Sequence, residues 1–177
     1  MRRTALWTSL ALGCAIAVFV GVLATREPAE VRLADSPLLG KPAPAASGTN
    51  IFDGSDVDLA AYEGKWVVLN FFASWCVPCK QEHPQIARFA QRHADDAQVV
   101  AVIWDDSVGA AKKFFRENGG DWPVIADPGV TIGLDYGVRG PPESFVIAPD
   151  GVVVAKYTGP LTAASLEQVM AGKRAPA

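Results

Sequence analysis

The sequence predicts an α/β fold in which helices flank a mixed central sheet. Two uncharged runs rich in β-branched and aromatic residues, Trp66–Phe72 and Gln98–Trp104, are typical of buried strands. Between them, Gln81–His93 places its apolar and small residues at the spacing of an amphipathic helix. Strand and helix patterns alternate along the rest of the chain, an order that places helices on the faces of a sheet.

The other elements follow from turn and cap residues. Asp53-Gly54 separates two short runs and predicts an N-terminal hairpin. Ser107 is expected to cap a helix that runs to about Glu117 and is closed by glycines. The remaining expected elements are a strand at 123–126, a helix at 130–136, strands at 144–148 and 152–157, and a helix at 162–170.

Residues 1–25 predict a membrane signal-anchor. Ala5–Ala24 contains no charge and has about the 20 residues that a membrane span needs. Arg2 and Arg3 precede it, which places the N-terminus in the cytoplasm and the rest of the chain outside. A cleaved secretory signal stays open, and so does a lipoprotein, because Gly13-Cys14 is a fragment of a lipid-attachment site.

The predicted domain occupies residues 45–172. The proline-rich residues 26–44 are expected to form a linker and residues 173–177 a tail. Residues 26–177 hold 14 of the 16 basic residues and all 19 acidic residues, which gives this part a net charge of −5. No basic stripe is evident, so a nucleic acid is not an expected partner.

Cys76 and Cys79 lie where the first predicted strand is followed by a helix. A helix N-terminus stabilises the thiolate, the reactive form of cysteine. Thiol–disulfide exchange needs one activated thiolate and a second thiol that resolves the mixed disulfide. We expect Cys76 to be the exposed nucleophile and Cys79, one turn on, to resolve it; Pro78 suits the first turn.

Other uses of this pair are a structural disulfide and a metal site. A disulfide that closes so short a loop constrains the unfolded chain little. Cys76, Cys79 and His83 share a helical face, but His93 lies ten residues on, about 15 Å along a helix. A four-ligand zinc site is therefore not evident, and no cofactor is expected beyond the redox-active disulfide. A Cu(I) carrier that uses the two cysteines and His83 stays open.

Several motifs resemble thioredoxin-like proteins. Val68–Lys80 resembles their active-site region, and the match is best to the membrane-anchored branch of TlpA, ResA and CcmG (DsbE). Gly40–Pro44 resembles the start of that branch's domain, Asp105–Tyr136 its central insertion, and Gly137–Phe145 the loop before its penultimate strand. The resemblance spans about residues 40–170 and implies a thioredoxin-like fold with an N-terminal hairpin and this insertion.

The resemblance also implies further site residues. It places a cis-proline at Pro142, opposite the cysteines, and leaves the backbone from Gly140 free to pair with an extended substrate. It brings Glu82 and Glu143 to the active site, as in branch members that reduce apocytochrome c. Trp75 is expected to be a partly exposed platform beside the nucleophile.

Asn70 departs from the best-known thioredoxin pattern, which has a buried aspartate there. Asparagine cannot accept the proton, so a base for Cys79 would be water, Glu82 or Glu143. His83 is expected to be a solvated helix residue. No histidine or charge stands between the cysteines, which predicts a reduction potential of roughly −200 to −300 mV.

The function that the resemblance implies is that of an enzyme, a thiol–disulfide oxidoreductase that reduces apocytochrome c cysteines during cytochrome c maturation. The enzyme would be anchored by a single pass in the bacterial cytoplasmic membrane, with its catalytic domain on the periplasmic side. A membrane thiol donor would re-reduce it. The alternative is a general extracytoplasmic reductase, for example of copper-site cysteines in a respiratory oxidase.

Overall fold

The computed structural model of the chain describes residues 12–19 and 32–172. Residues 12–19 are helical, and among the residues in these two ranges no helix is long and apolar enough to cross a membrane. Most of the predicted signal-anchor lies outside the described residues, and so does the predicted tail. The second range belongs to one compact unit.

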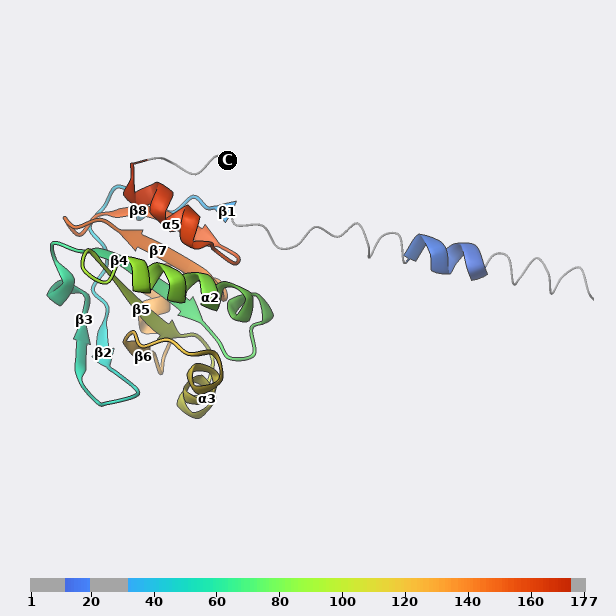
Figure 1. The fold of residues 1–177 in the computed structure, drawn as a ribbon, viewed down its shortest axis with the longest axis horizontal. Coiled ribbons are helices and arrows are strands. Elements are labelled where there is room, and N and C mark those ends of the chain that lie inside the picture. Colours follow the sequence, from blue (N-terminus) through green and yellow to red (C-terminus); the bar gives the residue numbers. More distant parts are fainter. Residues whose placement is uncertain (1–11, 20–31, 173–177) are drawn as a thin grey trace, which may run out of the picture. The chain divides into compact units, whose positions relative to one another are not determined.

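A six-stranded mixed sheet forms the centre of this unit, in the order β1-β8-β7-β4-β5-β6 (Figure 1). β4 pairs in parallel with β5 and antiparallel with β7, which confirms the predicted mixed sheet. The strands are β1 (Arg32–Leu33), β4 (Trp66–Phe72), β5 (Ala97–Ile103), β6 (Val124–Ala126), β7 (Glu143–Ile147) and β8 (Val153–Thr158).

The predicted hairpin forms a separate two-stranded sheet of β2 (Ser47–Thr49) and β3 (Asp56–Asp58), followed by the 3₁₀ helix η1 (Leu59–Tyr62). Gly54 in its turn has φ +75°, a conformation that glycine adopts without the steric cost of a Cβ atom. β2 lies three residues before the run expected at Asn50–Phe52, and β3 lies one residue before the run expected at Val57–Leu59. The turn between them extends over Asn50–Ser55.

Helices cover both faces of the sheet. α2 (Val77–Arg92) and α5 (Ala163–Met170) lie side by side on one face (Figure 1), and α3 (Val108–Asn118) packs into the same core cluster. The short α4 (Thr131–Asp135) and the β2–β3 hairpin contribute to the cluster on the other face. The expected caps are present: the Ser107 side chain accepts from the Ala110 N–H, and Thr162 and Ser165 form a capping box.

The domain begins earlier than the sequence predicts. Arg32–Leu33, inside the expected linker, pairs antiparallel with the edge of β8, where Arg32 lies opposite Thr158. The Gly40 N–H then donates to the Val153 carbonyl at 2.8 Å, and Pro42 forms an isolated bridge with Val152. The linker expectation fails here because these contacts are long-range and the segment has no internal period.

Candidate active site

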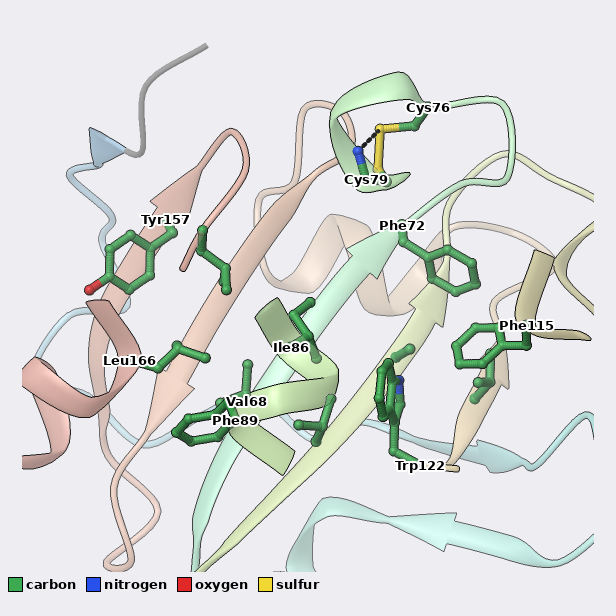
Figure 2. Packing of buried hydrophobic residues seen from close by; sticks show 14 of the residues in the cluster. Val68, Phe72, Cys76, Cys79, Ile86, Phe89, Phe115, Trp122, Tyr157 and Leu166 are labelled. Atoms are coloured by element: carbon green, nitrogen blue, oxygen red, sulfur yellow. Dashed lines mark hydrogen bonds between the residues drawn. A yellow bond between two sulfur atoms is a disulfide. The ribbon is translucent and has the colours of Figure 1, made fainter. Parts of the chain in front are cut away.

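The cysteine pair forms a disulfide at the N-terminus of α2, with a Cα–Cα distance of 5.2 Å. Figure 2 shows it at one end of the core cluster, beyond Phe72. Cys76 is the N-cap residue, and its Sγ accepts a hydrogen bond from the Cys79 N–H at 3.1 Å. In the reduced form, a hydrogen bond from the first turn of a helix stabilises a negative charge on a sulfur in this position.

The exposure of the nucleophile differs from expectation. The sequence predicts that Cys76 is exposed, but in the disulfide form only 3% of its surface is accessible, against 2% for Cys79. The capping geometry explains this, because it turns the Sγ of Cys76 back over the first turn of α2. Its neighbours Trp75 and Val77 are 56% and 63% exposed, so the surface around the disulfide is apolar and open.

Glu82 lies one turn after Cys79 and is buried rather than solvated. Its Oε1 accepts from Asn70 Nδ2 at 2.8 Å, and its Oε2 accepts from the Leu161 N–H at 3.1 Å. Asn70 Nδ2 also donates to Ser144 Oγ at 2.9 Å. Burial raises the pKa of Glu82 to about 7, although the two hydrogen bonds oppose this.

The site therefore contains a buried acid, although Asn70 itself cannot accept a proton. It occupies the β4 position where the best-known thioredoxin pattern has a carboxylate, and it donates to a carboxylate that comes from α2. A group with a pKa near neutrality can accept and release a proton at physiological pH. Glu82, one of the bases that the sequence leaves open for Cys79, has this property in the structure.

Glu143 points to the other face of the sheet. It alternates with Ser144 along β7 and shares its face with Phe145, which belongs to the second core cluster. Its Oε2 forms an ion pair with Lys156 Nζ at 2.7 Å, and its Oε1 accepts from the Arg139 N–H at 2.9 Å. Both charged side chains are buried. The structure thus separates Glu143 from Glu82 and gives it a cation as partner.

The proline loop lies at the same end of the sheet as the cysteines. Glu143 pairs with Phe71 near the C-terminal end of β4, so Pro142 precedes β7 at the end from which the chain continues to Cys76. The Pro141–Pro142 peptide bond is cis. Pro142 is buried and Gly140 is half-buried. The carbonyl of Pro142 accepts from the Gly159 N–H at 3.0 Å and is already paired within the domain.

His83 is not the solvated residue that the sequence predicts. It is buried, its Nε2 lies 2.7 Å from the Gly119 carbonyl oxygen, and its ring packs against Phe114, Phe115 and Trp122. Burial lowers its pKa. The ring faces the end of α3, where its Nε2 lies against the Gly119 carbonyl oxygen. Within residues 12–19 and 32–172, no group of three or more potential metal ligands is close enough to hold an ion.

Sequence reasoning missed two polar residues near the site. Lys156 lies in β8 between the buried residues Ala155 and Tyr157, and a lysine within such a run is a signal for a buried ion pair. Asp106 lies in the turn between β5 and α3, and its carboxylate accepts the Ser74 N–H at 2.7 Å. No local pattern distinguishes Asp106 from its neighbour Asp105.

The chain is similar to known proteins over most of this domain. A model of the Redoxin family matches residues 38–170. The thiol:disulfide interchange protein HelX of Rhodobacter capsulatus is 40% identical over 109 residues, which cover 61% of this chain and 59% of HelX. The chain thus aligns with less than two thirds of the length of HelX. The thiol:disulfide interchange protein DsbE of Allochromatium vinosum is 33% identical over 132 residues, covering 72% of this chain and 71% of that protein.

Solved structures of similar proteins have the same fold as this domain. A crystal structure from Chlorobium tepidum, of a protein described as a DsbE-type thiol:disulfide interchange protein, has a TM-score of 0.69 and 34% identity. It covers 75% of this chain and 96% of that one. A DsbF homologue from Corynebacterium diphtheriae has a TM-score of 0.70 and 26% identity, and it covers 80% and 92% of the two chains. The thioredoxin-like fold that the sequence motifs imply is confirmed.

Proposed function

Since the chain belongs to the Redoxin family, we propose that it is a thiol–disulfide oxidoreductase that acts outside the cytoplasm and reduces the cysteines of apocytochrome c. The observation that supports this best is the pairing of two features on α2. The Cys76–Cys79 disulfide caps the helix, and a buried carboxyl with a pKa of about 7 lies one turn further on. The relatives named thiol:disulfide interchange proteins support the same class of reaction.

The exchange starts from the reduced enzyme. The Cys76 thiolate attacks one sulfur of the substrate disulfide, and the other substrate sulfur leaves as a thiolate and takes up a proton. Cys79 then transfers its thiol proton to Glu82, and the resulting thiolate attacks the Sγ of Cys76. The bond between Cys76 and the substrate breaks, and the second substrate sulfur leaves as a thiolate that takes up the proton from Glu82. The substrate leaves with two thiols, having gained two electrons, and the enzyme is left with the disulfide seen in the structure.

Glu82 suits the second of these steps. A solvent-exposed carboxylate is too weak a base to take a proton from a thiol. A pKa of about 7 brings the proton affinity of Glu82 closer to that of the Cys79 thiol. The ionised form of Glu82 is held by Asn70 Nδ2 and the Leu161 N–H. The protonated form can be accommodated because the Asn70 side chain offers both an amide donor and a carbonyl acceptor.

Return to the reduced state needs two electrons from a thiol donor, which we place in the membrane. The anchoring of the chain through Ala5–Ala24, with the domain on the periplasmic side, belongs to the same proposal and rests on the uncharged segment that follows Arg2 and Arg3. Protease added to intact spheroplasts should digest the domain. Full protection of the domain until the membrane is lysed would overturn this placement.

Trapping with Cys79→Ser tests the substrate. Without the resolving thiol, Cys76 should remain joined to its substrate, and mass spectrometry of the trapped species should identify peptides with Cys-x-x-Cys-His, the haem-attachment motif. The matched control is Cys76→Ser, which lacks the nucleophile and should trap none of them. Trapped partners without any such peptide would show that the cytochrome assignment is wrong.

A direct assay tests the activity. The reduced enzyme should convert an oxidised Cys-x-x-Cys-His peptide to its dithiol with formation of one enzyme disulfide per peptide. Equilibration with glutathione should give a potential of roughly −200 to −300 mV. A potential near about −120 mV, the range of strong oxidants, would overturn the reductant assignment.

A further inference from the structure

The short connection between β4 and the cysteine pair, residues 73–75, is held by the turn that follows β5. Backbone pairing between the two strands ends where the Trp104 N–H donates to the Phe72 carbonyl at 2.9 Å. The Ser74 N–H is the next donor along the edge of β4 that faces β5. Its acceptor is a side-chain oxygen, Asp106 Oδ2, at 2.7 Å. The carboxylate thus extends the link between the strands by one hydrogen bond, at the point where the chain turns toward Cys76.

Both oxygens of this carboxylate are used. Asp106 Oδ1 accepts from the Ser107 N–H at 2.7 Å, and Ser107 in turn caps α3 by accepting the Ala110 N–H on its hydroxyl oxygen at 3.1 Å. Asp106 therefore joins residues 73–75 to the first turn of α3. The two N–H groups bond to different oxygens of the carboxylate, so an asparagine at this position would keep one acceptor and place an NH2 donor against the other N–H group.

The neighbouring residue Asp105 contributes its backbone. Its carbonyl accepts from the Trp75 Nε1–H at 3.1 Å, which orients a side chain that is 56% exposed. Asp105 has φ +43°, a left-handed conformation that aspartate and asparagine tolerate better than most residues. Its exposed carboxylate makes no hydrogen bond or ion pair among the described residues.

We propose that Asp106 is a positioning residue for thiol–disulfide exchange. By fixing residues 73–75 it holds Cys76 at the N-cap of α2, in the geometry in which the Cys76 Sγ accepts the Cys79 N–H. The same hydrogen bond stabilises the Cys76 thiolate in the reduced enzyme. The catalytic relevance of this inference rests on the proposed function, whereas its effect on Cys76 can be measured without any substrate.

The test compares Asp106→Asn with Asp105→Asn in the full chain. The two variants lose the same charge one residue apart, but only the first loses a side-chain acceptor. The measurement is the pH dependence of alkylation of reduced enzyme by iodoacetamide. It is followed by fragmentation mass spectrometry that assigns the label to Cys76, because the reduced enzyme also carries free thiols at Cys14 and, in the same peptide as Cys76, at Cys79.

Asp106→Asn should move the alkylation midpoint of Cys76 upward by about half a pH unit, equivalent to an about threefold loss of thiolate at low pH. Asp106→Ala should move it further, since it removes both acceptors. Asp105→Asn should leave the midpoint unchanged or lower it, because it only removes a negative charge. If Asp106→Asn and Asp105→Asn give the same midpoint, the proposal is wrong, even if Asp106→Ala fails to fold.

The outcome separates this inference from the proposed function. A wild-type enzyme that fails to reduce peptide disulfides would refute the function, while the alkylation midpoints would still decide the role of Asp106. An active wild-type enzyme with identical midpoints in the two asparagine variants would refute the positioning role alone.

Discussion

The stability of the oxidised protein should depend on pH through Glu82. Its pKa is about 7 in the folded protein against an ordinary value of 4.5, because burial disfavours the charged form. Between these two pH values the unfolded chain is ionised while the folded protein keeps the proton, so the free energy of unfolding falls as the pH rises. Each pH unit corresponds to about 1.4 kcal/mol, which gives a total loss of about 3 kcal/mol from pH 4 to pH 8.

Glu82→Gln isolates this contribution. The amide does not titrate, and it leaves either Asn70 Nδ2 or the Leu161 N–H without its acceptor, at a cost of about 1 kcal/mol that is independent of pH. Relative to wild type, the variant should therefore gain about 3 kcal/mol between pH 4 and pH 8, whatever the other carboxyl groups contribute.

Urea unfolding of the oxidised protein, repeated at several pH values, measures the difference. Glu63→Gln is the matched control, because Glu63 is an exposed carboxyl in the turn before β4 and its loss should reproduce the wild-type pH dependence. A constant difference between wild type and Glu82→Gln, within about 0.5 kcal/mol at all pH values, would refute the assigned pKa.

Two further predictions concern stability. Lys156→Met leaves the buried Glu143 without its cation and should lower the free energy of unfolding by about 3–5 kcal/mol. Adding Glu143→Gln should recover most of this loss. Equal stability of the single and double variants in urea unfolding would argue against the ion pair. Gly133→Ala should cost about 1–3 kcal/mol, because a Cβ atom would overlap the ring of Trp104. Gly109→Ala, in open space on α3, should instead gain about 0.5–1 kcal/mol, and thermal unfolding that ranks the two alike would contradict this packing.

The elements that the sequence predicts correctly are those with a strong local signal. The strand Trp66–Phe72 agrees with β4 at both ends, since its bulky residues are buried on both faces of the sheet and a glycine precedes it. Ser107 and Thr162 cap α3 and α5 because capping involves only the next three residues. The position of the cysteine pair at the start of α2 follows from the same kind of local signal, a strand pattern followed directly by a helix pattern.

The position of the acidic residues could not be predicted in this way. The family resemblance placed Glu82 at the active site, but only the packing of α2 against β4 and the loop before α5 buries it and raises its pKa to about 7. For Glu143 the deciding contact is with Lys156, 13 residues later on the neighbouring strand, and it depends on the register between β7 and β8.

By itself the sequence determined the fold class, the family resemblance and the location of the redox pair, because each rests on residues close together in the chain. The tertiary structure decided that the domain starts at β1, that His83 is buried against α3, and that the turn after β5 holds the residues before Cys76. Each of these depends on contacts between segments separated by about 30 residues or more, and local periodicity contains no information about which distant segments meet.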